Sequence, residues 1–114
     1  MRRGEVWLLN LEPTIGAEIR KTRPAIIVND DAIGILPLRV IVPITDWKDH
    51  YSVAPWMVKL DPDSQNGLTK PSAADAFQVR SLARERFVQR IGSISELHLL
   101  QIADPLALVL KIRG

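Results

Sequence analysis

Seven of the 15 basic residues of this chain fall into two groups, and ten of the 15 are arginines. The first group consists of Arg20, Lys21 and Arg23 in a polar segment of the sequence. The second group places four arginines at positions 80, 84, 86 and 90, with only Glu85 opposing them. A guanidinium is a planar fork of donors that matches a phosphate at two points. Because the net charge is only +2, it is the clustering that indicates a site for phosphate groups.

Arg23 and Thr45 are two side chains that rigid backbone would hold and that could donate to a phosphate. Pro24 fixes its own φ angle and restricts Arg23 to an extended backbone, so the base of the side chain is held firmly where a loop meets a strand. Thr45 ends a β-branched run and supplies a neutral hydroxyl donor beside a rigid segment. Preorganised donors of this kind stabilise the negative charge that develops when a nucleophile attacks phosphorus.

Composition excludes several other chemistries. The chain has no cysteine, and therefore no disulfide, no thiolate nucleophile and no cysteine-ligated metal site. Its two histidines, His50 and His98, have no second ligand at helical spacing, and we expect neither a metal nor a cofactor. No signal sequence and no run of 18 apolar residues is present, which predicts no membrane contact and a cytoplasmic protein.

The elements that must position these side chains are short strands within one domain, residues 1–114. Apolar and β-branched runs predict strands at 4–10, 24–28, 38–45, 53–60, 73–81 and 87–92. A loop is expected at 12–23, and a single helical turn after Asn29 that stops near Gly34. Pro43 and Pro55 interrupt two of the runs and indicate a strand end, an edge or a bulge.

The last part of the chain changes to a helical period. Ser93 and Glu96 match a capping box, and apolar residues follow at helical spacing as far as residue 110. Pro105 either kinks this helix or, with Asp104 as cap, begins a second one. Five or six strands and one broken helix predict a mainly β fold of the α+β class, with a small bent sheet or barrel and a packed C-terminal helix.

Two motifs carry a resemblance to a known family. They are G-x-E-x-x-K-x-R-P at residues 16–24 and V-P-x-T at 42–45. In their order and separation they resemble the MazF/PemK family of toxin endoribonucleases from type II toxin–antitoxin pairs. Further matching segments cover nearly all of the chain: 3–7, 11–13, 25–30, 71–72, 78–81 and 90–92.

The resemblance implies a small SH3-like barrel of the CcdB/MazF/PemK toxin type, assembled as a homodimer. It also implies metal-independent, sequence-selective cleavage of single-stranded RNA without a cofactor. In that reaction the 2′-hydroxyl of the substrate attacks the adjacent phosphorus and leaves a 2′,3′-cyclic phosphate and a 5′-hydroxyl end. The implied partner is a cognate antitoxin whose acidic, disordered tail lies across the arginine-rich groove, and operator DNA is contacted only through that antitoxin.

Site residues carry over from the family one at a time. Arg23 and Thr45 match its two principal catalytic positions, and Glu18 is a candidate general base or an orienting carboxylate for Arg23. Arg20 and Lys21 are expected to position phosphate groups. Arginine stays protonated at ordinary pH, although the family sometimes assigns it proton transfer, so the identity of the base is left open.

The chain departs from the family pattern before its Gln-x-Arg segment. Where many members have an acidic residue this chain has Phe77, and where some have an arginine it has Asp75. Because alternate residues of a strand share a face, Asp75 could replace the missing carboxylate. Phe77 could instead stack on a base. We therefore expect RNA contacts from Asp75, Phe77, Gln78, Arg80 and Trp47, with an altered sequence preference.

Two alternatives belong to other functional classes. The first is a non-nucleolytic toxin of the same fold that poisons DNA gyrase, as the CcdB type does. That type relies on aromatic and glycine features at its extreme C-terminus, and residues 111–114, KIRG, do not match them. The second is a catalytically inactive relative that only binds nucleic acid or antitoxin, and the departure at Phe77 keeps this alternative open.

Overall fold

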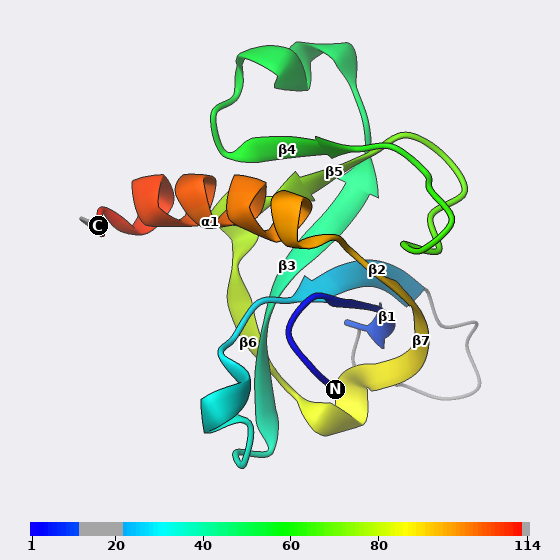
Figure 1. Ribbon diagram of the computed structural model, residues 1–114, viewed down its shortest axis with the longest axis vertical. Helices are drawn as coiled ribbons and strands as arrows, with labels where there is room; N and C mark the ends of the chain where they lie inside the picture. The colour runs from blue at the N-terminus through cyan, green and yellow to red at the C-terminus, as the bar shows by residue number, and fades with distance from the viewer. Residues whose placement is uncertain (12–21, 113–114) are drawn as a thin grey trace.

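The computed structural model describes residues 1–11 and 22–112. Their strands are β1 (Glu5–Asn10), β2 (Thr22–Ile27), β3 (Leu38–Asp46), β4 (Met57–Leu60), β5 (Ser72–Asp75), β6 (Arg80–Ala83) and β7 (Phe87–Ser93). One helix, α1 (Glu96–Leu110), follows the strands. Four short 3₁₀ turns are η1 (Asp31–Ile33), η2 (Asp49–Val53), η3 (Ala76–Gln78) and η4 (Arg84–Arg86). The predicted mainly β fold with a C-terminal helix is confirmed (Figure 1).

The strands form one antiparallel sheet whose longest member, β3, has two different neighbours on one edge. The order is β4-β5-β3-β2-β1-β7, and β6 pairs with the beginning of β3. Residues 38–41 of β3 face β6, whereas residues 44–46 face β5. Pro43 stands where the neighbour changes, so a residue without an N–H group is accommodated inside the strand. The expectation that Pro43 would end the strand or lie at an edge is therefore wrong.

A loop after β4 brings the two ends of this sheet together. The amide of Ser93 in β7 donates to the carbonyl oxygen of Gln65 at 2.9 Å. Gly67 has a φ of +72°, and a Cβ there would lie 2.2 Å from the carbonyl oxygen of Ile91. Buried Asn66 braces the loop by donating to the carbonyl of Asp61 at 2.9 Å. The loop thus seals against β7 and gives the bent sheet a barrel-like shape.

Side chains on both faces of β2 are buried, which explains the continuous apolar run in its sequence. Ile26 belongs to a core cluster with Ile44, Leu99 and residues of β1, β3, β4 and β5, beneath α1. Ala25 and Ile27 point the other way, into a second cluster with Leu9, Ile41 and Leu82. Strand β2, which contains Arg23, therefore packs between the two core clusters.

The C-terminal helix is continuous, unlike the broken helix expected from sequence. Pro105 lies buried inside α1 and does not end it, so the alternative of a second helix capped by Asp104 is wrong. The predicted capping box is also wrong, because Ser93 ends β7. Ser95 is the N-cap and accepts from the amide of His98 at 3.2 Å. Within the described residues, no helix is long and apolar enough to cross a membrane.

Two of the predicted strands are shorter than expected. The run 53–60 yields only β4, because η2 and a short connection occupy its beginning. The run 73–81 is split by η3, since the Asp75 carboxylate accepts from the amide of Phe77 at 3.1 Å and caps a turn. Asp75 is consequently buried, whereas Phe77 is 65% exposed. The expectation that these two residues share one strand face is wrong.

Candidate active site

Arg23 and Thr45 come from neighbouring strands. In the β2–β3 pairing Ala25 faces Pro43, and the same antiparallel register continued by two residues sets Arg23 opposite Thr45. The other edge of β2 is covered as well, because Leu9 of β1 pairs with Arg23. Arg23 is exposed and Thr45 is half-buried. The backbone below both side chains therefore belongs to the sheet interior while their polar groups stay accessible.

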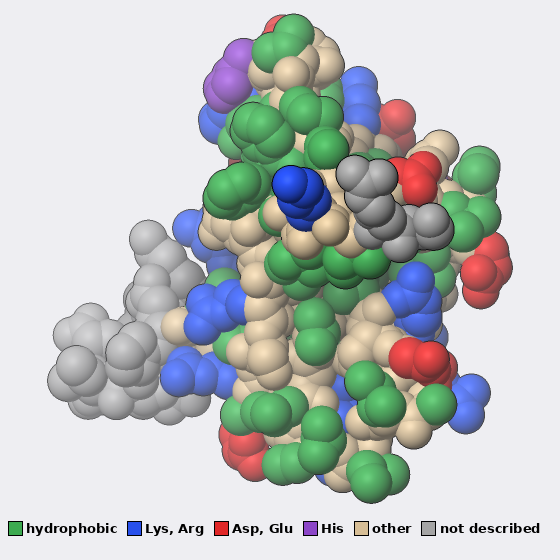
Figure 2. All heavy atoms as spheres, turned by 90° about the vertical axis from the view of Figure 1, so that its left-hand side faces the viewer, with side chains coloured by type: hydrophobic (Ala, Val, Ile, Leu, Met, Phe, Trp, Pro, Cys, Tyr) green, Lys and Arg blue, Asp and Glu red, His purple; other side chains and the backbone are tan. Residues whose placement is uncertain are grey.

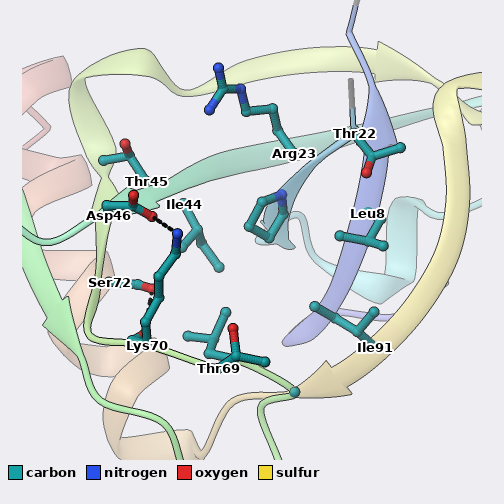
Figure 3. A pocket seen from close by; sticks show the side chains of 13 residues that line it. Leu8, Thr22, Arg23, Ile44, Thr45, Asp46, Thr69, Lys70, Ser72 and Ile91 are labelled. Atoms are coloured by element: carbon teal, nitrogen blue, oxygen red, sulfur yellow. Dashed lines mark hydrogen bonds and ion pairs between the residues drawn. The ribbon is translucent and has the colours of Figure 1, made fainter. Parts of the chain in front are cut away.

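A first cavity of about 400 Å³ opens beside this pair. Figure 3 shows Leu8, Ile44 and Ile91, which form its apolar wall, with Arg23 at the rim of the cavity and its guanidinium directed away from these side chains. Gly67 also lines it, so the sealing loop described above forms part of the wall. The full lining is Leu8, Thr22, Arg23, Pro24, Ile44, Thr45, Asp46, Gly67, Leu68, Thr69, Lys70, Ser72 and Ile91.

Lys70 brings a second cation to the first cavity, and the sequence interpretation missed it. Its Nζ lies 3.1 Å from Oδ1 of Asp46, in an exposed ion pair drawn as a dashed line in Figure 3. The segment is fastened by the Ser72 hydroxyl, which donates to the carbonyl of Lys70 at 2.9 Å. The amide of Trp47 donates to the carbonyl of Pro71 at 3.0 Å. The signal available in the sequence was a lysine directly before the Pro71-Ser72 match.

A second cavity of about 300 Å³ lies on the other side of the same pair. Its lining is Leu11, Arg23, Pro43, Ile44, Thr45, Tyr51, Asp75 and Gln78. Arg23, Ile44 and Thr45 line both cavities. The two donors predicted to act on a phosphate therefore stand on the boundary between two hollows.

Asp75 and Gln78 meet in the second cavity because of the 3₁₀ turn between them. Side chains three residues apart are eclipsed in such a turn. Nε2 of Gln78 donates to Oδ2 of Asp75 at 2.8 Å, while Oδ1 of Asp75 accepts from the amide of Phe77. Both carboxylate oxygens are thus engaged.

Tyr51 is a second lining residue that the sequence interpretation missed. It comes from η2, and its ring meets Trp47 edge to face at a centroid distance of 5.8 Å. Nζ of Lys59 lies 5.3 Å from the centroid of the Trp47 ring. Trp47 itself lines neither cavity, but it packs behind Tyr51, which lines the second one. A polar aromatic residue in the loop after Thr45 was the available signal for Tyr51.

Other residues predicted to contact RNA lie farther away or outside the described residues. Phe77 packs against Trp56 with ring centroids 5.9 Å apart, and Arg80 begins β6 opposite Ile41. Neither lines the first or the second cavity. Glu18, Arg20 and Lys21 lie outside the described residues. Among the residues described, no three histidine or acidic side chains gather as a metal site would require.

Comparison with known protein families gives the class of this fold. Residues 2–110 match the model of the PemK-like, MazF-like toxins of type II toxin–antitoxin systems. The chain therefore belongs to this family. It is 35% identical to endoribonuclease MazF9 of Mycobacterium tuberculosis over 98% of both chains. It is also 42% identical to endoribonuclease PemK of Escherichia coli, over 54% of this chain and 47% of that protein.

Solved structures agree on the fold. The MazF chain of a MazE–MazF complex from Deinococcus radiodurans matches with a TM-score of 0.79 at 24% identity, covering 99% of this chain and 97% of that one. A mycobacterial endoribonuclease in complex with its cognate antitoxin matches with a TM-score of 0.78 at 22% identity, covering 100% and 98%. The bent sheet with its C-terminal helix is thus the fold of the MazF toxins.

Proposed function

We propose that this toxin is an endoribonuclease that cuts single-stranded RNA between two nucleotides whose bases enter the two cavities. The observation that carries the proposal is the position of Arg23 and Thr45 on the boundary shared by both hollows. A phosphate that links two nucleotides would meet both donors there. The relatives named above are endoribonucleases, which supports the same reaction class and does not favour a gyrase poison.

The proposed chemistry is an in-line displacement at phosphorus. The 2′-oxygen forms a bond to phosphorus, the bond to the 5′-oxygen breaks, and the products carry a 2′,3′-cyclic phosphate and a 5′-hydroxyl. Arg23 donates to the non-bridging oxygens as their charge rises, and the Thr45 hydroxyl donates beside it. One proton leaves the 2′-hydroxyl and one reaches the departing oxygen. Glu18 stays the candidate base.

Cations outside the boundary pair are proposed to guide the strand. Lys70 lines the first cavity, and Arg20, Lys21 and Arg80 would contact phosphates farther along the RNA. Exposed aromatic side chains supply faces on which bases can stack, and Phe77 is the most exposed of them. Such stacking requires unpaired bases, which is why the proposed substrate is single-stranded.

Partners follow from the same surface. Arg23 and Lys70 would attract an acidic, disordered antitoxin tail, which would cover the site and exclude RNA. Solved relatives bound to antitoxins support such a complex. Operator DNA would be reached only through that antitoxin. An RNA substrate also implies that the toxin acts in the cytoplasm.

A homodimer is part of the proposal. Large apolar side chains are exposed on α1, at Leu97, Leu100 and Leu108, and in the loop of Ile33, Ile35 and Leu36. Figure 2 shows hydrophobic side chains gathered at the lower end of the face it presents. Exposed apolar groups of this extent are typical of contacts between protein chains.

Mapping of RNA ends tests the proposal. The purified protein is incubated with a long mixed-sequence RNA in EDTA, beside the variants Arg23→Ala and Thr45→Ala. We expect discrete cuts with 5′-hydroxyl ends that both variants lose, whereas the exposed control Arg2→Ala retains them. Absence of cleavage with and without magnesium would refute the proposal and favour an inactive binding relative. A melting curve of Arg23→Ala that matches the wild type would separate loss of chemistry from loss of fold.

A further inference from the structure

The two ends of the Gln78 amide are made unequal by Asp75. Nε2 of Gln78 lies 2.8 Å from Oδ2 of Asp75, and an ionised carboxylate only accepts hydrogen bonds. The nitrogen end of the amide must therefore face Asp75. The carbonyl oxygen Oε1 is the end left free to accept from a ligand in the second cavity, which Gln78 lines.

Asp75 is itself held in place, so the orientation is not easily reversed. Its side chain is buried at the end of β5, and its Oδ1 accepts from the amide of Phe77 at 3.1 Å. The turn is tied to the chain before β4, because the amide of Ala76 donates to the carbonyl of Trp56 at 3.0 Å. Movement of the Asp75 carboxylate away from this position would break the N-cap of this turn.

We infer that Asp75 is a positioning residue that sets the base preference of the second cavity by orienting Gln78. The inference rests on the proposed function. Oε1 accepts, so at a base edge presented through C6 of a purine or C4 of a pyrimidine it favours the amino group of adenine or cytosine. Guanine and uracil present a carbonyl oxygen at the corresponding position. Two acceptors would then face each other, and a polar group would lose its partner on binding.

The expected discrimination is about tenfold, which corresponds to one well-formed contact to a base edge. Removal of the amide in Gln78→Ala should abolish the preference at one position of the recognised sequence. Gln101→Ala is the matched control, because Gln101 is an exposed glutamine on α1. That variant should leave the preference unchanged.

The decisive variant is Asp75→Asn. Its side-chain oxygen is still required by the Phe77 amide, so its new NH₂ group faces Gln78 and donates. Gln78 must then turn its oxygen toward residue 75 and its nitrogen toward the ligand. Asparagine is as good an N-cap as aspartate, and the turn should persist. The preference should therefore move from adenine and cytosine to guanine and uracil at that position, by about tenfold.

Deep sequencing of RNA ends from a randomised substrate pool measures the base preference of the wild type and of the three variants. A preference that stays unchanged in Asp75→Asn overturns the inference, and so does an equal loss of cutting at every sequence. A preference that disappears without reversing also overturns it.

The orientation of the amide is tested without RNA by the side-chain NH₂ resonances of Gln78. We expect two widely separated proton signals that converge in Asp75→Ala, whereas those of Gln101 do not change. Unchanged Gln78 signals overturn the inference. A wild-type protein that cuts no RNA refutes the proposed function instead, and these resonances then decide the orientation by themselves.

Discussion

The two cavities on either side of Arg23 and Thr45 are built in different ways. The first depends on contacts between distant segments, where the loop after β4 seals against β7 and contributes Gly67 and Lys70. The second depends on local turns, η2 and η3, which supply Tyr51 and Gln78. A wall made by backbone packing changes only when the fold changes. A wall made by turn side chains can change its chemistry one residue at a time.

This difference assigns different tasks to the two halves of the site. The first cavity should give affinity and a fixed position for the phosphate, because its cation and its apolar wall are tied to the sheet. The second should give selectivity, because its polar groups are held by a short capped turn. We therefore expect substitutions in different parts of the site to affect different measured quantities and by different amounts. These parts are the shared boundary, each cavity wall and the supporting strands.

Loss of the shared donor should have the largest effect. In Arg23→Ala we expect kcat for RNA cleavage to fall by about 10²–10³-fold, the cost of removing one preorganised donor at a developing charge. The thermal midpoint should stay within a few degrees of wild type because Arg23 is exposed. Single-turnover cleavage and a melting curve measure the two quantities. A fall confined to KM would contradict a catalytic role for Arg23.

Damage to the first wall should appear as instability. A Cβ at Gly67 would lie 2.2 Å from the Ile91 carbonyl oxygen, at a positive φ of 72°. We expect Gly67→Ala to lower the free energy of unfolding by about 2–4 kcal/mol, from backbone strain and a forced shift of the seal. Urea denaturation measures this loss. Gly34→Ala is the control, because Gly34 has a negative φ and should tolerate the change with a much smaller loss.

Removal of the cation in the first cavity should act on binding. Lys70→Ala should raise KM by up to about tenfold, because one contact between a cation and an RNA phosphate is lost. The slope of log affinity against log salt should fall by about one for Lys70→Ala and should not change for Arg2→Ala. Filter binding to RNA at several salt concentrations measures both slopes. An unchanged slope for Lys70→Ala would show that Asp46 already neutralises this lysine.

The smallest predicted effect concerns the strands behind the first cavity. Burial alone would raise the pKa of Glu5, but hydrogen bonds from Trp7 and the Arg2 backbone, with the charges of the N-terminus and Arg90, hold it below its usual value. A lowered folded-state pKa stabilises the protein above the unfolded pKa, and this gain is lost as the pH falls below about 4.5 through the folded value.

The variant Glu5→Gln should remove part of this pH dependence. Acid titration of the free energy of unfolding should show a shallower decline in the variant, by less than about 1 kcal/mol, because the burial of Glu5 opposes the hydrogen bonds and charges that lower its pKa. Activity at neutral pH should stay unchanged. Identical acid profiles for the two proteins would contradict the assigned pKa direction.

The boundary shared by the two cavities could be predicted from sequence because its signals are local. Pro24 fixes the backbone of Arg23, and the apolar runs on either side of it identify β2 and β3. The register that sets Arg23 opposite Thr45 follows from the two runs once they pair. Lys70 and Gly67 could not be placed in this way. Gly67 is placed by its contact with Ile91, and the segment of Lys70 by the hydrogen bond between the Trp47 amide and the Pro71 carbonyl, and both contacts join residues more than 20 positions apart.

The second cavity was mispredicted at residues 73–81, where a 3₁₀ turn interrupts what the apolar run predicted as one strand. Alternation placed Asp75 and Phe77 together, but a carboxylate that caps its own following turn competes with strand continuation. Gln78 was expected at the site, although not its partnership with Asp75. The prediction of a broken helix at Pro105 also failed. Packing of α1 against the sheet outweighs the one backbone hydrogen bond that Pro105 cannot make.

The burial of both faces of β2 has a consequence for how such a toxin is silenced. Amide hydrogens of Ile26 and Ile27 should be among the slowest to exchange, because only global opening exposes a strand held between two cores. Arg23 stands near the beginning of that strand, so its backbone shares this rigidity. Local unfolding of β2 is therefore not expected to inactivate the protein. Control falls to another molecule that covers the surface, or to the rate at which the whole chain is degraded.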